Sequence, residues 1–293
     1  MRTRLKRLGL ICSAALLLGA CSTLSISLPP VTDTPTEEFR GGSIIWHDLL
    51  TTDIEASKRF YGGLFGWEFE EVPLSLGFGR SGDYLMIRNN GKLIGGMVDT
   101  SAVKTRINNS QWVPIMSVGS VDSAVQKILD SGGKVITPVT DLNERGRIAI
   151  ITDATDALLA LLEPRYGDPV KSQAMSGDFF WDEVWSDDTS LAVRFYRSLA
   201  PYSVREEDFN GKKYTALEYQ GEPRFGFMQE PIPGLEPTWA SYIKVDDMSV
   251  LEQVEELGGT VAIPAAPRGK GEVALILGPS GAGVVLQTWP EEG

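Results

Sequence analysis

Apolar side chains in the first half of the chain follow a pattern of short strands around one amphipathic helix. Residues 44–51 are apolar on both alternating faces and are bounded by Gly-Gly and Thr-Thr-Asp, which is typical of a strand buried on both sides. Asp53 then provides an N-cap for a helix through about Leu64, and Gly66 ends it. Gly-rich turns separate three further strand-like segments, at residues 67–72, 84–88 and 93–98. The pattern therefore predicts a βαβββ unit.

The same order of elements follows again up to residue 162. Residues 113–118 have the pattern of a strand and residues 121–129 that of a helix, which Gly132-Gly133 terminates. Three more predicted strands follow, at residues 134–137, 147–151 and 158–162. The second half of the chain has the same arrangement, with residues 250–257 as its second helix and residues 284–287 as its last strand. Each half is therefore predicted to contain two βαβββ modules in an α+β fold.

The two halves of the chain are copies of one another. At a constant spacing of 135 residues, Trp46, Asp53, Arg59, Phe60, Tyr61 and Leu64 recur as Trp181, Asp188, Arg194, Phe195, Tyr196 and Leu199. Further along, Tyr84 and Gly96 recur as Tyr214 and Gly226, and the spacing shrinks only to 125 by the last strands. An internal repeat of this length predicts two homologous domains, residues 43–165 and 178–290, which pair within the chain.

Residues 1–20 have the pattern of an export signal. Basic residues at positions 2, 4, 6 and 7 precede an apolar run that is shorter than the roughly 20 residues needed to span a bilayer. Leu18-Gly19-Ala20-Cys21 resembles a bacterial lipobox, and this resemblance implies cleavage before Cys21 and attachment of lipid to it. The alternative is an ordinary signal peptide with a chance cysteine. In a Gram-negative cell, Ser22 resembles the signal for outer-membrane sorting. We therefore expect an envelope protein that is lipid-anchored on the periplasmic side of the outer membrane.

The predicted mature chain is acidic and keeps one cysteine. Residues 21–42 are rich in Ser, Thr and Pro without periodicity, and we expect a flexible tether. Cys12 leaves with the signal, so no intrachain disulfide can form and the core must stabilise each domain. Loss of the four signal cations from 27 leaves 23 basic and 39 acidic residues, a net charge of −16. This charge disfavours nucleic acid as a partner, and the membrane would be reached through acyl chains.

Two motifs carry a resemblance to a known superfamily. The helix end F-Y-x-x-L-F-G-W at residues 60–67 and the turn G-G-K-V at residues 132–135, in this order of elements, resemble the vicinal oxygen chelate superfamily. This superfamily is also called glyoxalase/bleomycin-resistance-like, and Trp46-x-Asp48-Leu49 is similar to the W-x-[D/E]-L of a tandem subgroup. The resemblance covers nearly all of the chain after residue 42. It implies that paired modules roll their sheets into a cup that holds a small molecule.

The resemblance also implies where catalytic members hold a divalent metal. The four ligand positions fall on Trp46, Val113, Ala160 and the segment 95–97 in the first half, and on Trp181, Ala240, Val285 and the segment 225–227 in the second. None of these residues offers the imidazole or carboxylate that such a site needs. His47, the one histidine, lies one residue from a ligand position and so on the opposite strand face, where we expect a structural role. We therefore predict no metal and no cofactor.

Aromatic and acidic residues stand where the metal would be held. Trp46 and Asp48 share one strand face, as do Trp181, Glu183 and Trp185, and an indole beside a carboxylate favours a cationic or hydrogen-bond-donating small molecule. The candidate ligand-binding residues are Trp46, Asp48, Met97, Trp112, Trp181, Glu183, Phe227 and Trp239. Alternatively, the tryptophans fill space and the acids bond backbone or arginine, and Trp112 and Trp239 pack at a hinge. Asp48 and Glu183 are also the candidates for proton transfer.

Two basic turns occupy matched positions, Arg145-Gly146-Arg147 and Arg268-Gly269-Lys270-Gly271. Such a turn could cover an anion, but a hairpin connection with solvated charges is the simpler prediction. Three functions stay open. The first is a lipid-anchored, metal-free tandem protein whose cups bind a small organic molecule. The second is an enzyme of the same fold, a metal-independent or residually metal-dependent lyase or hydroxylase that uses Asp48 or Glu183. The third is an envelope protein-interaction module with both cups packed shut.

Overall fold

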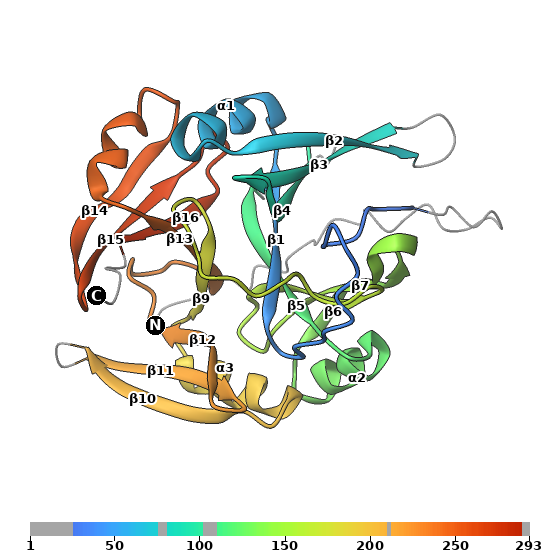
Figure 1. The fold of residues 1–293 in the computed structure, drawn as a ribbon. Coiled ribbons are helices and arrows are strands. Elements are labelled where there is room, and N and C mark those ends of the chain that lie inside the picture. The colour runs from blue at the N-terminus through green and yellow to red at the C-terminus, as the bar shows by residue number, and fades with distance from the viewer. Residues whose placement is uncertain (1–25, 76–80, 102–109, 210–211, 289–293) are drawn as a thin grey trace, which may run out of the picture.

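The first half of the chain forms one eight-stranded curved sheet. The computed structural model describes residues 26–75, 81–101, 110–209 and 212–288. Strands of the first sheet lie in the order β2-β3-β4-β1-β5-β8-β7-β6 (Figure 1). The strands are β1 (Ile44–Thr51), β2 (Glu68–Ser75), β3 (Ser81–Asn89), β4 (Lys92–Asp99), β5 (Gln111–Ser117), β6 (Lys134–Asp141), β7 (Gly146–Thr152) and β8 (Leu158–Pro164). The helical segments are α1 (Ile54–Phe65), α2 (Val121–Asp130) and the 3₁₀ turn η1 (Asn143–Arg145).

The second half forms a second eight-stranded sheet with the same topology. Its strands lie in the order β10-β11-β12-β9-β13-β16-β15-β14. They are β9 (Phe179–Trp185), β10 (Ser203–Phe209), β11 (Lys212–Tyr219), β12 (Glu222–Met228), β13 (Thr238–Val245), β14 (Thr260–Arg268), β15 (Gly271–Leu277) and β16 (Gly283–Thr288). The helical segments are α3 (Thr189–Leu199) and the 3₁₀ helix η2 (Met248–Gln253). In each sheet the two modules meet at the antiparallel central pair, β1–β5 or β9–β13, so the prediction of two modules per domain is confirmed.

The first helix of each domain begins at a capping aspartate, and that of the first domain also ends at the predicted glycine. Asp53 accepts a hydrogen bond from the backbone N–H of Ala56 at 2.8 Å, and Asp188 accepts one from Leu191 at 2.8 Å. Gly66 ends α1 with a φ of 72°, a left-handed conformation that glycine adopts without strain. These caps hold each helix in register with the strand before it.

The second helix of the second domain differs from its prediction. Residues 248–253 form the 3₁₀ helix η2, and turns follow where an α-helix over residues 250–257 was expected. Glu252, Glu255 and Glu256 are three and four residues apart, so an α-helix would stack like charges on one face. The corresponding α2 of the first domain has Lys127 on that stretch and is a regular α-helix.

The two domains pack reciprocally through their helices. Phe60 and Tyr61 of α1 join a core with Ile243 and Val284 of the second domain, and α1 lies beside the β13–β16 half of that domain (Figure 1). In the other half, α3 contacts α2 and the two share a core. Matched residues make matched contacts: Trp67 donates to the carbonyl of Gly177 at 2.9 Å, and Tyr202 donates to that of Gly42 at 3.0 Å. Each domain therefore anchors the residues that lead into the first strand of the other.

The segment before β1 differs from the flexible tether that its composition predicts. Residues 26–42 contain no helix or strand, yet Leu28 and Val31 are buried against Trp46 in the concave core of the first sheet. The Leu28 backbone N–H donates to the carbonyl of Leu142 at 3.2 Å, beside η1. Arg88 binds Asp33 through both terminal nitrogens at 2.9 and 2.7 Å and lowers the pKa of that carboxyl. Apolar residues on either side of Pro29-Pro30 thus hold the segment on the domain. Residues 21–25 lie outside the described residues.

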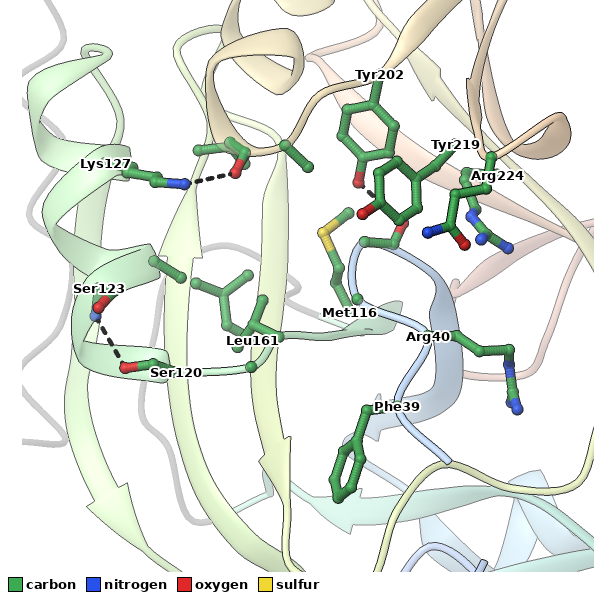
Figure 2. A pocket seen from close by; sticks show the side chains of 18 residues that line it. Phe39, Arg40, Met116, Ser120, Ser123, Lys127, Leu161, Tyr202, Tyr219 and Arg224 are labelled. Atoms are coloured by element: carbon green, nitrogen blue, oxygen red, sulfur yellow. Dashed lines mark hydrogen bonds between the residues drawn. The ribbon is translucent and has the colours of Figure 1, made fainter. Parts of the chain in front are cut away.

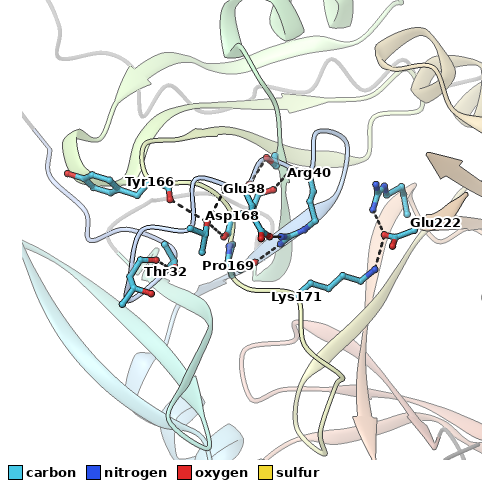
Figure 3. Close-up of polar contacts among 12 residues, drawn as sticks. Thr32, Glu38, Arg40, Tyr166, Asp168, Pro169, Lys171 and Glu222 are labelled. Carbon is cyan, nitrogen blue, oxygen red and sulfur yellow. Dashed lines mark hydrogen bonds and ion pairs between the residues drawn. The ribbon is translucent and has the colours of Figure 1, made fainter. Parts of the chain in front are cut away.

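Polar contacts hold the rest of this segment against the linker between the domains. Thr36 donates its hydroxyl to the carbonyl of Asp168 at 2.7 Å, and Ser117 of β5 donates to the carboxylate of the same residue at 2.7 Å (Figure 3). The backbone N–H of Arg40 also donates to that carboxylate, and the Arg40 guanidinium donates to the carbonyl of Pro169. Asp168 is fully buried, so it ties the segment, the first sheet and the linker together.

Across the described residues, helices are too short or too polar to cross a lipid bilayer. The predicted signal and Cys21 lie outside that range.

Candidate functional site

A hydrogen-bonded cluster occupies the concave face of the first sheet. Trp46 and Asp48 point to the same side of β1, and Asp48 lies opposite Gly96 on β4 and Val113 on β5. One carboxylate oxygen of Asp48 accepts from the Trp46 indole at 2.9 Å and from the Tyr84 hydroxyl at 2.7 Å. The strand face predicted for these two residues is therefore the one observed. Tyr84 completes a triad that the sequence analysis left unassigned.

Arg145 enters this cluster from the turn between β6 and β7. Its guanidinium donates to the Tyr84 hydroxyl at 2.6 Å and to the carbonyl of Pro29 at 2.8 Å, and it lies 5.1 Å from the centre of the Trp46 ring. Arg145 is only 1% exposed, which corrects the expectation of a solvated hairpin charge. Burial raises the pKa of Tyr84 well above its usual range, so this phenol stays protonated and can donate to Asp48.

The second sheet repeats the cluster with a longer acid. Glu183 on β9 is fully buried and lies opposite Gly226 and Ala240. Its donors come from five side chains of the second domain, namely Trp181, Trp185, Tyr214, Tyr242 and Arg268. Two of these distances are 3.0 Å from Trp185 and 2.8 Å from Tyr214. A carboxylate has about four lone-pair positions, so the acceptor capacity of Glu183 is filled within the protein.

Arg268, the last residue of β14, forms a direct ion pair with Glu183 from just before the turn that matches the one carrying Arg145. Burial disfavours the charged guanidinium, but the adjacent Glu183 carboxylate outweighs it and raises the pKa of Arg268. Burial and the same carboxylate also raise the pKa of Tyr214 and Tyr242. The cluster therefore pairs its one acid directly with a guanidinium, whose charge compensates that of the carboxylate. Of the two alternatives from the sequence, a carboxylate that attracts a cationic ligand and an acid bonded to arginine, the second describes Glu183, because Arg268 supplies the cation.

Matched glycines make room for the tyrosines of both clusters. A Cβ atom on Gly96 would lie 1.9 Å from the Tyr84 hydroxyl, and one on Gly226 would lie 2.0 Å from the Tyr214 hydroxyl. Any side chain at either position would displace the phenol that holds the acid. The joint recurrence of Tyr84 with Gly96 as Tyr214 with Gly226 was the sequence signal that could have revealed both tyrosines. The matched basic segments that contain Arg145 and Arg268 were a weaker signal for the arginines, because the two residues are not in strict register in the repeat.

The side chains on these faces do not fit a divalent metal. Val113 and Ala160 line the first concave core, and Ala240 and Val285 line the second, at the positions where the resemblance implies ligands. Within the described ranges, no three His, Cys, Asp or Glu residues come together to hold an ion. The one acid in each cluster already accepts from indole and phenol donors, and a guanidinium beside it would repel a cation.

His47 lies on the opposite face of β1 and contacts the other domain. Its Nε2 lies 2.9 Å from the carboxylate of Asp182, and its ring stacks on Phe179 with centroids 3.9 Å apart. Asp182 is the residue that matches His47 in the repeat, and it also accepts from Ser241 at 2.7 Å. Both His47 and Asp182 are buried, so this pair joins the two first strands at the domain interface.

Four of the eight predicted ligand-binding residues lie away from the concave faces. Met97 and Trp112 belong to the core that contains α1, and Phe227 and Trp239 belong to the core that contains α3. Trp112 donates its indole N–H to Tyr61 at 3.0 Å, and Trp239 donates to Tyr196 at 3.1 Å. Because Gly96 and Val113 face the cluster, their neighbours Met97 and Trp112 must face the helix side. The hinge-packing alternative is the correct one for both tryptophans.

The two concave faces differ in how far they are covered. Trp46, Tyr84 and Arg145 are all buried beneath residues 26–31. In the second domain Trp181 and Tyr214 stay partly exposed, and the Arg268 side chain is 19% exposed. Leu235, from the loop before β13, packs against the same buried core as Trp181. A molecule from solvent can therefore reach aromatic surface in the second cluster but not in the first.

Comparisons with known proteins place the chain in a family. No model of a protein family matches it. CFP32 of Mycobacterium tuberculosis, which is named as a candidate glyoxylase, is 30% identical over 248 residues that cover 84% of this chain and 94% of CFP32. The anthracycline biosynthesis protein DauV of Streptomyces sp. is 26% identical over 258 residues. The aligned region covers 84% of this chain and 92% of DauV.

Solved structures agree at the level of the fold. The Mn(II)-bound glyoxalase from Novosphingobium aromaticivorans superimposes with a TM-score of 0.57 at 14% identity, covering 85% of this chain and 83% of that one. The strand order, the paired modules and the identity to CFP32 agree. The chain belongs to the vicinal oxygen chelate, or glyoxalase-like, superfamily as a tandem two-domain member.

Proposed function

We propose that this is a lipid-anchored envelope protein that binds a small organic molecule, without a metal, on the concave face of its second domain. Small-molecule binding or turnover is the general role that its glyoxalase-like relatives support. The observation that carries the proposal is the Glu183 cluster. Two indoles, two phenols and a guanidinium surround one acid where metal-dependent members would hold an ion.

The chemistry of the accessible side chains indicates what the face would bind. Trp181 and Tyr214 present partly exposed aromatic rings, and the charges beneath them are compensated by the Glu183–Arg268 pair. Such a surface favours a flat, uncharged aromatic molecule that stacks on the indole over a cation or a strong acid. DauV is named for the biosynthesis of anthracyclines, which are planar polycyclic aromatics, and this supports the same class of ligand.

A pair of matched variants tests this assignment. We expect 1,8-dihydroxyanthraquinone to bind the purified protein after treatment with EDTA, as followed by isothermal titration calorimetry. Trp181→Leu should weaken binding about two- to tenfold, because one aromatic stack contributes about 0.5–1.5 kcal/mol beyond its buried area. Trp46→Leu, the matched change under residues 26–31, should leave affinity unchanged. Binding that returns only with added Mn²⁺, Zn²⁺ or Fe²⁺, or equal loss in both variants, would contradict the proposal.

Proton transfer through these acids has less support. All acceptor positions of Glu183 are engaged by donors of the protein, so a substrate proton would have to displace one of them. Asp48 is bonded to Trp46 and Tyr84 beneath the N-terminal segment. Binding rather than catalysis therefore accounts better for the arrangement.

The anchor follows from Cys21, five residues before the first described residue. Five residues span at most about 17 Å, so a lipid on Cys21 would hold the first domain close to the membrane surface. The second concave face would remain on a separate sheet, free to meet a soluble ligand. Metabolic labelling with an alkyne fatty acid should mark the protein, and Cys21→Ala should lose the label and move to the soluble fraction. A labelled Cys21→Ala protein would refute lipidation at this residue.

A further inference from the structure

A second hollow lies between the two domains, away from both concave faces. It has a volume of about 380 Å³, within the range of small-molecule sites. The segment before β1, helix α2 and the β11–β12 hairpin form its walls, so both domains contribute to it (Figure 2). In this view Phe39 lies at one end of the hollow, and Tyr202 and Tyr219 lie at the opposite end.

The charge of this hollow is opposite to that of the whole chain. Its described lining includes Arg40, Lys127 and Arg224 and no aspartate or glutamate, whereas the chain has a formal net charge of −12. Arg40 and Arg224 also line an adjoining hollow of about 480 Å³, again without a lining carboxylate. A cationic concavity on an acidic protein concentrates anions locally.

Arg224 has a hydrogen-bonding donor that the protein leaves unused. Its side chain is only 8% exposed, and its buried Nε has no partner among the described atoms. A terminal nitrogen lies 3.3 Å from Glu222, but that acid also binds Lys171 at 2.8 Å. Glu222 is thus shared between two cations, so Arg224 keeps capacity for an anion. A buried donor without a partner is costly, which indicates that a ligand completes the site.

The remaining lining indicates the body of that ligand. The Tyr219 ring centre lies 5.7 Å from the Arg224 guanidinium, and the buried Met116 also belongs to the lining (Figure 2). Lys127 donates to the carbonyl of Leu199 at 2.9 Å, and this bond holds its charge at the end of the hollow away from Arg224 (Figure 2). The N-terminus of α2 contributes little, because Glu163 already accepts from the N–H of Val121.

We propose that this inter-domain hollow binds an amphipathic aromatic acid. Its anionic group is bonded by Arg224 and Arg40, and its ring packs against the partly exposed Tyr219. Trp181 lines the adjoining hollow but not this one, so the ligand proposed for the second domain and this acid would occupy neighbouring but separate sites.

Calorimetry with two naphthalene probes tests this site. In the unmodified protein 2-naphthoate should bind one site per chain at least about tenfold more tightly than uncharged 2-naphthylmethanol, since charge-assisted hydrogen bonds are the stronger class. Arg224→Gln should abolish that preference. Lys127→Gln, which changes an exposed residue and leaves the fold intact, should weaken naphthoate binding about threefold, because it removes one nearby charge.

Two controls separate this site from its neighbours. Arg205→Gln removes an exposed cation from β10 and should leave naphthoate affinity unchanged. Trp181→Leu should also leave it unchanged, so failure of the proposed function would be distinguishable from failure of this site. Equal affinity for the two probes, absence of naphthoate binding, or naphthoate binding that neither Arg224→Gln nor Lys127→Gln weakens would overturn the proposal.

Discussion

The two domains build the same cluster and finish it differently. In the first, Arg145 reaches Asp48 through the Tyr84 hydroxyl and uses another nitrogen to hold Pro29 of the covering segment. In the second, the extra methylene of Glu183 brings its carboxylate into direct contact with Arg268. A matched motif thus supports a closed core in one domain and a partly exposed aromatic face in the other. Whether a concave face is closed or accessible therefore depends on the segment that covers it as well as on the residues of the sheet.

Replacing Arg268 should change the free energy of unfolding more than any other substitution considered below. The cost should be smaller for Arg145, so it should differ between the two domains. Arg268→Met leaves Glu183 buried without its cation, which we expect to destabilise the protein by about 3–5 kcal/mol. Arg145→Met breaks hydrogen bonds but no direct ion pair, and should cost about 1–3 kcal/mol. Urea unfolding of both variants measures the difference. Glu183→Gln combined with Arg268→Met should recover part of the loss, and a larger cost for Arg145→Met would contradict this view of the clusters.

His47 and Asp182 occupy equivalent positions of the repeat but differ in chemistry, so they provide a second test of how the two domains differ. Asp182 would remain buried without its main partner in His47→Ala, at an expected cost of about 3 kcal/mol. An exchange, His47→Asp with Asp182→His, rebuilds the pair across the interface and should recover at least half of that loss. The free energy of unfolding at pH 7 is the measurement. If the exchanged protein is no more stable than the single variant, the pair does not act as a unit.

Release of the covering segment should make the first domain resemble the second. Val31→Asp buries a charge against Trp46, and we expect a loss of about 2–3 kcal/mol with rapid proteolysis within residues 26–42. The anthraquinone stoichiometry should then rise from one to two per chain. Ile232→Asp is the control, at a residue of the second domain that is 39% exposed. It should change neither the proteolysis of residues 26–42 nor the anthraquinone stoichiometry. Unchanged proteolysis of Val31→Asp would show that the segment does not depend on this contact.

The smallest expected effect concerns pH and another mismatch between the copies. Asp153, which accepts from Thr155, Ala157 and Tyr196, is matched by the non-titrating Gly278. Burial raises the pKa of Asp153 above its value in an unfolded chain, so its contribution is fully present below about pH 4 and is lost as pH rises through the folded pKa. Asp153→Asn should therefore gain stability relative to the unmodified protein between pH 4 and pH 7. If the free energies of unfolding of the two proteins change in parallel between pH 4 and pH 7, the predicted direction of the Asp153 effect is wrong.

Much of this architecture could be predicted because it depends on local patterns. Alternation along residues 44–51 and the cap at Asp53 define a strand and a helix wherever they occur, and the repeat then requires two similar domains. The shared face of Trp46 and Asp48 follows from the same alternation. Applied from Val113, that rule would also have placed Trp112 on the helix side, so this error was avoidable. The weakness of the last predicted helix was visible in its clustered glutamates.

Other features depend on residues that meet only after folding. Arg145 lies in a turn and Arg268 beside one, and the composition of both segments suits solvent, but their side chains meet the Tyr84 hydroxyl and the Glu183 carboxylate across the sheet. The burial of Leu28 and Val31 depends on a concave surface made more than ten residues later in the chain. Periodicity in the amino-acid sequence therefore determined the modules and their duplication. The tertiary structure decided which face is closed and which acid is neutralised, because burial and ion pairing are set by distances through space.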